Sequence, residues 1–222
     1  RQMGIKVLPP DINEGDGVFT AVGENIRYGL YAIKSIGRPV VDLILEERKQ
    51  NGTFQTLQSF LERVASREVN KRAVENLIKA GACDCLDGNR QQMMTVFAVI
   101  MDNLASEKKK SMSGQMTLFD LVPEEEKKDY EICLPKLEEY SKEMKLGFEK
   151  EVLGVYVSGH PLEEYQELWQ NCISNTAGDF ALDEESGEVE LVKDQANAVI
   201  GGLIADKNVK YTKNDKIMAF LN

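Results

Sequence analysis

The chain has 222 residues, of which 42% are hydrophobic and 29% charged, enough for one large soluble domain or two small ones. Its net charge of −10 argues against a surface that binds nucleic acid everywhere. Residues 1–100 carry 13 Lys or Arg against 12 Asp or Glu, so the acidic excess lies in residues 101–222. The sequence shows neither a run of roughly 18 apolar residues nor a signal peptide, which predicts a cytoplasmic protein without a membrane partner.

Residues 1–30 are expected to form short extended pieces. Pro9-Pro10 forbids helix, and the turn-prone run GEN separates the β-rich runs GVFT and IRYGL. From about residue 31 the apolar period becomes helical, with Pro39 placed for a first helical turn and Asn51-Gly52 placed to end the helix. A second helical face follows, formed by Phe54, Leu57, Phe60, Leu61 and Val64.

Two more helices carry start and stop signals. Asn70 is a good N-cap for a helix that Gly81 would end, and the apolar face of this helix contains Val74, Leu77 and Ile78. Asn89 is a second N-cap, before a face formed by Met93, Val96, Phe97, Ile100 and Leu104. Residues 105–131 are charged and contain Ser, Gly and Pro, which predicts an exposed linker.

The last part of the chain mixes helix with a β hairpin. Helix is expected over residues 136–153, and another helix opens after Pro161. Residues 174–196 are acidic and rich in turn formers, and residues 197–222 contain two β-rich runs around the turn-prone KND. The fold class is therefore mainly α with a smaller β part.

Two joints between predicted helices have the form of helix-hairpin-helix corners. Such a corner presents backbone N–H groups at the start of its second helix, where they bind a phosphate whatever the base sequence. The first joint contains Lys34, Ser35, Ile36, Gly37 and Arg38, with Ile36 expected to plug into the core, and the weaker second joint contains Lys79, Ala80, Gly81 and Ala82. The alternative is a pair of ordinary turns closed by glycine C-caps.

The terminal hairpin carries a second candidate binding site. Its basic and aromatic residues suit the first strands of an OB-type barrel, a fold that binds single strands by stacking bases on aromatic rings. The candidate residues are Lys207, Lys210, Tyr211 and Lys213. A generic hairpin without a binding role is the alternative.

The predicted linker contains the sequence QMTLF, which has the form of a short linear peptide. Gln115 would orient the peptide, and Leu118 and Phe119 would enter an apolar pocket on a partner, with Met116 and Thr117 between them. In the alternative interpretation, the Leu-Phe pair packs against the chain's own helices and fixes the linker there.

The sequence shows no catalytic constellation. A single histidine, His160, excludes most Ser/His or Cys/His arrangements, and in the run SGHPL it is expected to cap a turn. The sequence also lacks a GxxxxGK[ST] phosphate loop. The cysteines contain no C-x-x-C pair, which favours free thiols over zinc ligands at Cys83, Cys85, Cys133 and Cys172.

Several stretches taken in series resemble one known family. They are GIKVLPPDIN, IRYGLYAIKSIG, NKRAVENLIKAGACDCL with NRQQMM, GQMTLFD, EKEVLGVYVSGHPLEEY and the terminal hairpin. In this order they are similar to the C-terminal half of the alpha subunit of bacterial DNA polymerase III, the replicative polymerase of the C family. The start at Arg1 and the end inside a strand-like run agree with a piece of such a protein.

The resemblance implies a domain organisation and a function for each part. Residues 1–30 would end the fingers domain, and residues 31–110 would be a tandem helix-hairpin-helix module that grips duplex DNA. Residues 111–131 would be a linker whose QMTLF peptide docks on the β sliding clamp. Connecting helices and an acidic turn region would fill residues 132–196, and residues 197–222 would begin an OB domain that binds the single-stranded template.

The resemblance also implies chemistry that lies outside this chain. Family members transfer nucleotides with Mg²⁺ ions held by palm carboxylates. Those carboxylates would precede Arg1, so the chain alone should hold no cofactor and be inactive, while other replicase subunits join its partners. Ser35 and Ala80 depart from the glycine that many hairpins carry at this position, which raises the cost of the turn. A non-catalytic scaffold or DNA-repair adaptor remains the alternative function.

Overall fold

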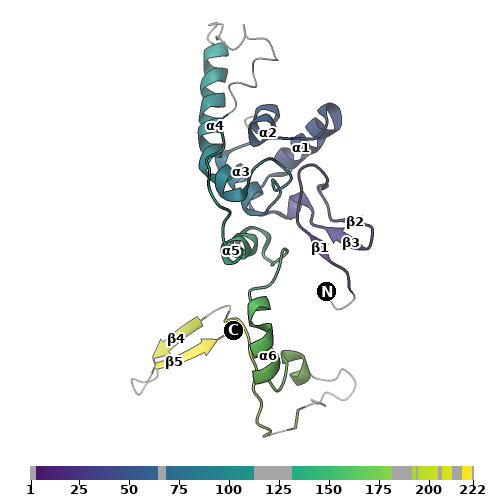
Figure 1. Ribbon diagram of the computed structural model, residues 1–222, viewed down its shortest axis with the longest axis vertical. Helices are drawn as coiled ribbons and strands as arrows, with labels where there is room; N and C mark the ends of the chain where they lie inside the picture. The colour runs from purple at the N-terminus through teal and green to yellow at the C-terminus, as the bar shows by residue number, and fades with distance from the viewer. Residues whose placement is uncertain are drawn as a thin grey trace. The chain divides into compact units, whose positions relative to one another are not determined.

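The computed structural model describes residues 4–64, 69–112, 132–181, 192–193, 195–204, 207–211 and 217–221. The chain divides into two compact units, the first reaching Gly159 and the second beginning at His160 (Figure 1). Helices predominate and strands are few, so the expected mainly α fold with a smaller β part is confirmed. Among the described residues, no helix is both long enough and apolar enough to cross a bilayer.

A small sheet opens the first unit. Its strands are β1 (Val7–Leu8), β2 (Thr20–Val22) and β3 (Asn25–Arg27), in the order β1-β3-β2. Strand β3 pairs parallel with β1 and antiparallel with β2. The tight β2–β3 turn contains Gly23 at a φ of +58°, a backbone conformation that glycine adopts without a steric cost. The extended pieces expected before residue 31 are therefore present.

The helices of the first unit begin and end where local chemistry predicts. A short 3₁₀ helix, η1 (Leu30–Ala32), precedes α1 (Arg38–Asn51), α2 (Leu57–Arg63), α3 (Lys71–Lys79) and α4 (Arg90–Met112). Pro39 lies in the first turn of α1, and the side chains of Asn70 and Asn89 accept hydrogen bonds of 2.9 Å from the backbone N–H groups of Ala73 and Gln92.

Three boundaries differ from the sequence expectation. Phe54, expected on the face of the second helix, lies before α2, because the Thr56 side chain caps that helix at its start. Helix α4 continues to Met112, so the linker expected from residue 105 begins inside a helix. The run 107–110 is Glu and Lys, which are good helix formers when solvated. Helix α5 (Lys142–Leu153) starts later than residue 136, because the Ser141 hydroxyl accepts from the backbone N–H of Met144 and caps it there.

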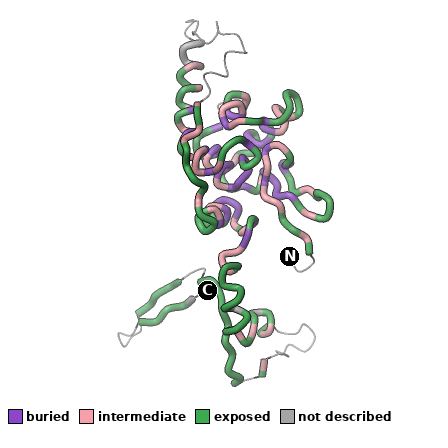
Figure 2. The backbone as a smooth tube through the Cα atoms, in the orientation of Figure 1, coloured by how far each residue is buried: buried purple, intermediate pink, exposed green. Residues whose placement is uncertain are grey.

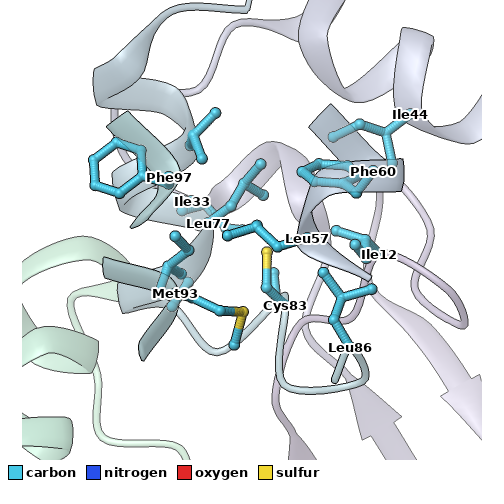
Figure 3. Close-up of a cluster of buried hydrophobic side chains, with 14 of the residues drawn as sticks. Ile12, Ile33, Ile44, Leu57, Phe60, Leu77, Cys83, Leu86, Met93 and Phe97 are labelled. Atoms are coloured by element: carbon cyan, nitrogen blue, oxygen red, sulfur yellow. The ribbon is translucent and has the colours of Figure 1, made fainter. Parts of the chain in front are cut away.

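One hydrophobic core holds the first unit together. Figure 3 shows side chains from the loop at Ile12, from several helices and from the turn at Cys83 meeting in one cluster. Phe60 is fully buried there, which contributes roughly 2–3 kcal/mol of transfer free energy. The same cluster includes Val152, Leu153 and Val157, so the segment after residue 131 packs onto the helices that precede it (Figure 2).

The second unit is small and largely exposed. It contains η4 (Glu163–Tyr165), α6 (Gln166–Cys172), η5 (Ala177–Phe180), β4 (Lys207–Tyr211) and β5 (Ile217–Leu221). Strands β4 and β5 pair antiparallel, which confirms the terminal hairpin. His160 Nδ1 accepts from the backbone N–H of Leu162 at 3.2 Å, so His160 caps a turn as expected.

Candidate nucleic-acid interface

The first predicted corner connects η1 to α1 and turns at Ser35. This residue has a φ of +60°, in the left-handed region that side chains other than glycine's enter at a cost. Ile36 is partly buried against the core, as expected. Lys34, Ser35, Gly37 and Arg38 are exposed around it. The corner therefore places a basic, glycine-bearing turn at the surface of the first unit.

Helix α1 starts at this corner without a side-chain cap. Its N-cap residue, Gly37, has no side chain that could accept a first-turn N–H, and the first turn contains no acidic residue. By contrast α2, α3 and α5 start with a side chain that accepts a backbone N–H, from Thr56, Asn70 and Ser141. Pro39 has no N–H group, and the N–H groups of Val40 and Val41 donate to the Gly37 carbonyl. The amides of Gly37 and Arg38, at the positive end of the helix dipole, are therefore the ones that can meet an anion.

Arg38 lies over an aromatic ring beside that helix end. Its guanidinium carbon is 4.9 Å from the centroid of the Tyr31 ring, a cation–π distance. The Tyr31 hydroxyl donates to the carboxylate of Asp42, and this hydrogen bond raises the pKa of the phenol. The ring is therefore fixed from the α1 side and restrains where the exposed Arg38 side chain can reach.

Lys34 makes hydrogen bonds through its N–H, its carbonyl and its ammonium, which the sequence did not predict. Its backbone N–H donates to the carbonyl of Val152 at 2.9 Å, and its own carbonyl accepts from Asn76 Nδ2 at 2.8 Å. Its ammonium donates to the Glu151 carbonyl at 3.0 Å, at the C-terminal end of α5. The charged group of Lys34 therefore contacts the C-terminal end of α5 as well as lying at the exposed surface of the corner.

The second predicted corner uses its amide groups internally. Gly81, at a φ of +79°, donates its N–H to the Ile78 carbonyl, and Ala82 donates to the Leu77 carbonyl, both at 3.0 Å. This is the glycine C-cap pattern of a helix end. Both residues are buried, and the ammonium of Lys79 pairs with Glu75 at 2.9 Å and Glu151 at 3.0 Å. The first corner is consequently the better candidate.

A buried ionic cluster lies beside the second corner, and sequence reasoning missed it. Arg90 is 4% exposed and donates from Nε and Nη2 to the Asp84 carboxylate and from Nη1 to the Lys79 carbonyl. Glu149 is fully buried, and its Oε2 accepts from the backbone N–H groups of Val157 and Ser158, both at 2.9 Å. The signal was present, because Glu149 lies on the apolar face of α5, three residues after Leu146 and three before Val152.

The terminal hairpin separates its predicted binding residues onto two faces. The strand period puts Lys207 and Tyr211 on one face of β4 and Lys210 on the other, where its ammonium is 5.6 Å from the centroid of the Phe220 ring. Tyr211 is 76% exposed, so its ring is accessible. Lys213 lies outside the described residues.

The predicted clamp-binding peptide, Gln115 to Phe119, also lies outside the described residues, but the chain on both sides of it is placed. Before the peptide, α4 packs in the core of the first unit. After it, the N–H of Ile132 donates to Gln58 Oε1 at 2.8 Å, and the carbonyl of Pro135 accepts from Gln92 Nε2 at 2.8 Å. The segment that carries the peptide thus leaves and rejoins the same unit.

Comparison with known proteins agrees with this arrangement. Residues 4–93 match a family model described as a helix-hairpin-helix motif, and these residues include both corners. The chain is 36% identical over 220 residues to the DNA polymerase III subunit alpha of Aquifex aeolicus, an alignment that covers 99% of this chain and 16% of the relative. The chain belongs to the DNA polymerase III alpha family.

Other DNA polymerase III alpha subunits match to a similar extent. That of Deinococcus radiodurans is 37% identical over 225 aligned positions, covering 99% of this chain and 16% of the relative. That of Chlamydia pneumoniae is 37% identical over 181 residues, covering 81% of this chain and 15% of the relative. The chain therefore spans about a sixth of the length of these DNA polymerase III alpha subunits.

Proposed function

We propose that this chain is the DNA-binding and clamp-tethering region of a replicative DNA polymerase. The observation that carries the proposal is the first corner. It combines the uncapped start of α1 with the exposed Arg38, inside a segment that matches a helix-hairpin-helix motif. Backbone N–H groups and a guanidinium can bind phosphate oxygens, and contacts to phosphate carry no base information. A polymerase that must hold any sequence needs this kind of contact.

A charge reversal at the corner tests the DNA grip. Arg38→Glu should weaken duplex binding by roughly tenfold, about 1.4 kcal/mol, and lower the slope of log affinity against log salt by about one. Lys49→Glu is the matched control, since Lys49 is an exposed cation in the last turn of the same helix. Equal affinities for the two variants, measured by fluorescence anisotropy on one duplex, would refute the corner as the phosphate site.

We infer that the peptide Gln115–Phe119 docks on a ring-shaped sliding clamp. Support comes from its sequence and from the anchoring of both flanks on the first unit, which contains the proposed DNA grip. Tethering converts rebinding into a local event at high effective concentration. Leu118→Ala with Phe119→Ala should abolish binding to purified clamp in surface plasmon resonance, whereas Leu121→Ala with Val122→Ala should retain it. Binding that survives the first pair would refute the assignment.

For the terminal hairpin we propose contacts to a single-stranded template. The support is the exposed Tyr211 on the same face as Lys207. A base stacked on a tyrosine ring contributes about 1–3 kcal/mol. Tyr211→Ala should therefore weaken oligothymidine binding, and Tyr165→Ala, an exposed tyrosine outside the hairpin, should not. Identical affinities would count against the hairpin.

Nucleotide transfer is proposed for a longer protein that carries this segment, in line with the name of its relatives. The sequence of the chain itself shows no catalytic constellation. We expect the isolated chain to extend no primer when supplied with Mg²⁺ and nucleotides. Measurable nucleotide incorporation by the isolated chain would refute the proposal that catalysis belongs to another part of a longer protein.

A further inference from the structure

The backbone of the first corner is fixed by two elements distant in sequence. On one side, α3 supplies Asn76, whose Nδ2 donates to the Lys34 carbonyl at 2.8 Å. On the other side, α5 supplies the Val152 carbonyl, which accepts the Lys34 N–H at 2.9 Å. Both peptide groups of the residue before the turn are therefore bound, and α5 lies beside α3 to supply them (Figure 1).

These contacts matter because the turn itself is unfavourable. Ser35 has a φ of +60°, and a side chain in this region costs about 1–2 kcal/mol relative to the right-handed one. Such a conformation persists only where surrounding contacts determine it. Asn76 and the carbonyl end of α5 provide them at the residue immediately before Ser35.

Both supporting elements are themselves buried or hydrogen-bonded where they touch the corner. Asn76 is 7% exposed on a helix whose neighbouring residues Val74 and Leu77 are fully buried. The end of α5 is held by the Tyr28 hydroxyl, which donates to the Leu153 carbonyl at 2.9 Å, and by the buried Glu149 carboxylate, which binds the turn that follows. Asn76 is thus a buried amide whose donor points at the loop and not into the core.

We propose that Asn76 and the carbonyl end of α5 are positioning elements of the DNA grip. They hold Lys34 so that the amides of Gly37 and Arg38 and the Arg38 guanidinium face the phosphate together. The inference rests on the proposed DNA binding by the first corner. It assigns a role to the segment that follows the linker: α5 completes the grip that begins in the helices before the linker. Asn76 contacts no DNA in this proposal and acts through Lys34.

The test compares two substitutions on the same helix, α3, in the 222-residue chain. Asn76→Leu removes the donor to Lys34 and keeps the number of side-chain heavy atoms, and we expect duplex affinity to fall about fivefold to tenfold. Val74→Ala truncates a fully buried side chain and lowers stability without touching Lys34, so we expect duplex affinity within twofold of wild type. Urea unfolding measures the stability that each variant has lost, so the effect of stability on duplex affinity can be separated from the effect of the lost hydrogen bond.

An amide spectrum separates positioning from a purely structural role. In ¹H–¹⁵N correlation spectra, Asn76→Leu should shift or broaden the resonances of Ser35 to Arg38, while that of Gly81 should stay in place. Glu149→Ala, which removes the acceptor of the two N–H groups in the turn after α5, should speed hydrogen exchange at the Lys34 amide. If Asn76→Leu does not fold, Asn76→Ser gives the same comparison, because its hydroxyl is too short to reach the Lys34 carbonyl.

The outcomes are distinguishable. A wild-type chain that does not bind duplex would refute the DNA-binding proposal itself. A wild-type chain that binds, together with an Asn76 variant that binds equally well and leaves the Ser35–Arg38 resonances unchanged, would refute the positioning role alone. Equal weakening by Asn76→Leu and Val74→Ala would also refute it, because general stability would then explain the loss.

Discussion

Removing the buried carboxylate of Glu149 should cost a large share of the stability of the first unit. Glu149 is fully buried, its Oε2 accepts two backbone N–H bonds of 2.9 Å, and its Oε1 lies 3.8 Å from Arg90 Nη2. Hydrogen bonds to a charged acceptor contribute about 1.5–3 kcal/mol each, and breaking a buried charge pair costs about 3–5 kcal/mol. We expect Glu149→Ala to lower the free energy of unfolding by about 3–5 kcal/mol.

Urea unfolding followed by far-UV circular dichroism measures this loss. Glu149→Gln separates the causes: its side-chain oxygen can still accept both N–H bonds while the charge facing Arg90 is removed, so about half of the loss should remain. Glu151→Ala is the matched control two residues along α5, since the Glu151 side chain is 58% exposed and its pair with Lys79 should contribute at most about 1 kcal/mol. If Glu149→Ala and Glu151→Ala unfold at the same urea concentration, the buried carboxylate does not hold the turn.

Three further changes have definite expected outcomes. Ser35→Gly should raise the free energy of unfolding by about 0.5–1 kcal/mol in urea titrations, because glycine adopts a φ of +60° without strain; a loss of stability would contradict the cost assigned to the turn. Phe60→Ala should lower it by about 3–5 kcal/mol in the same titration, and a change below about 1 kcal/mol would show that the core closes around the void. Cys85 is exposed as a residue, yet partial desolvation of its thiol and the nearby Asp11 carboxylate raise its pKa to about 12. Iodoacetamide should therefore label Cys133 and Cys172 first by mass spectrometry, and labelling of Cys85 at the same rate as these two would refute the shift.

Local chemistry explains why many features of the chain could be predicted from its sequence. Asn70 and Asn89 cap helices through hydrogen bonds to amides three residues away, and Gly81 ends a helix through its own positive φ. The terminal hairpin followed from strand-forming residues around a turn, and the family followed from several such stretches in order. Each of these depends on neighbours a few positions apart, so the sequence alone contains the information.

Only the tertiary structure decided how the two corners differ. They look alike in sequence, yet the second uses its amides to cap α3, and the first leaves the start of α1 uncapped. The contacts that hold the first corner join Lys34 to Asn76 and Glu151, separated by 42 and 117 residues. Pairings at such separations are set by how helices pack around a shared core, and no pattern within a short window of sequence encodes them.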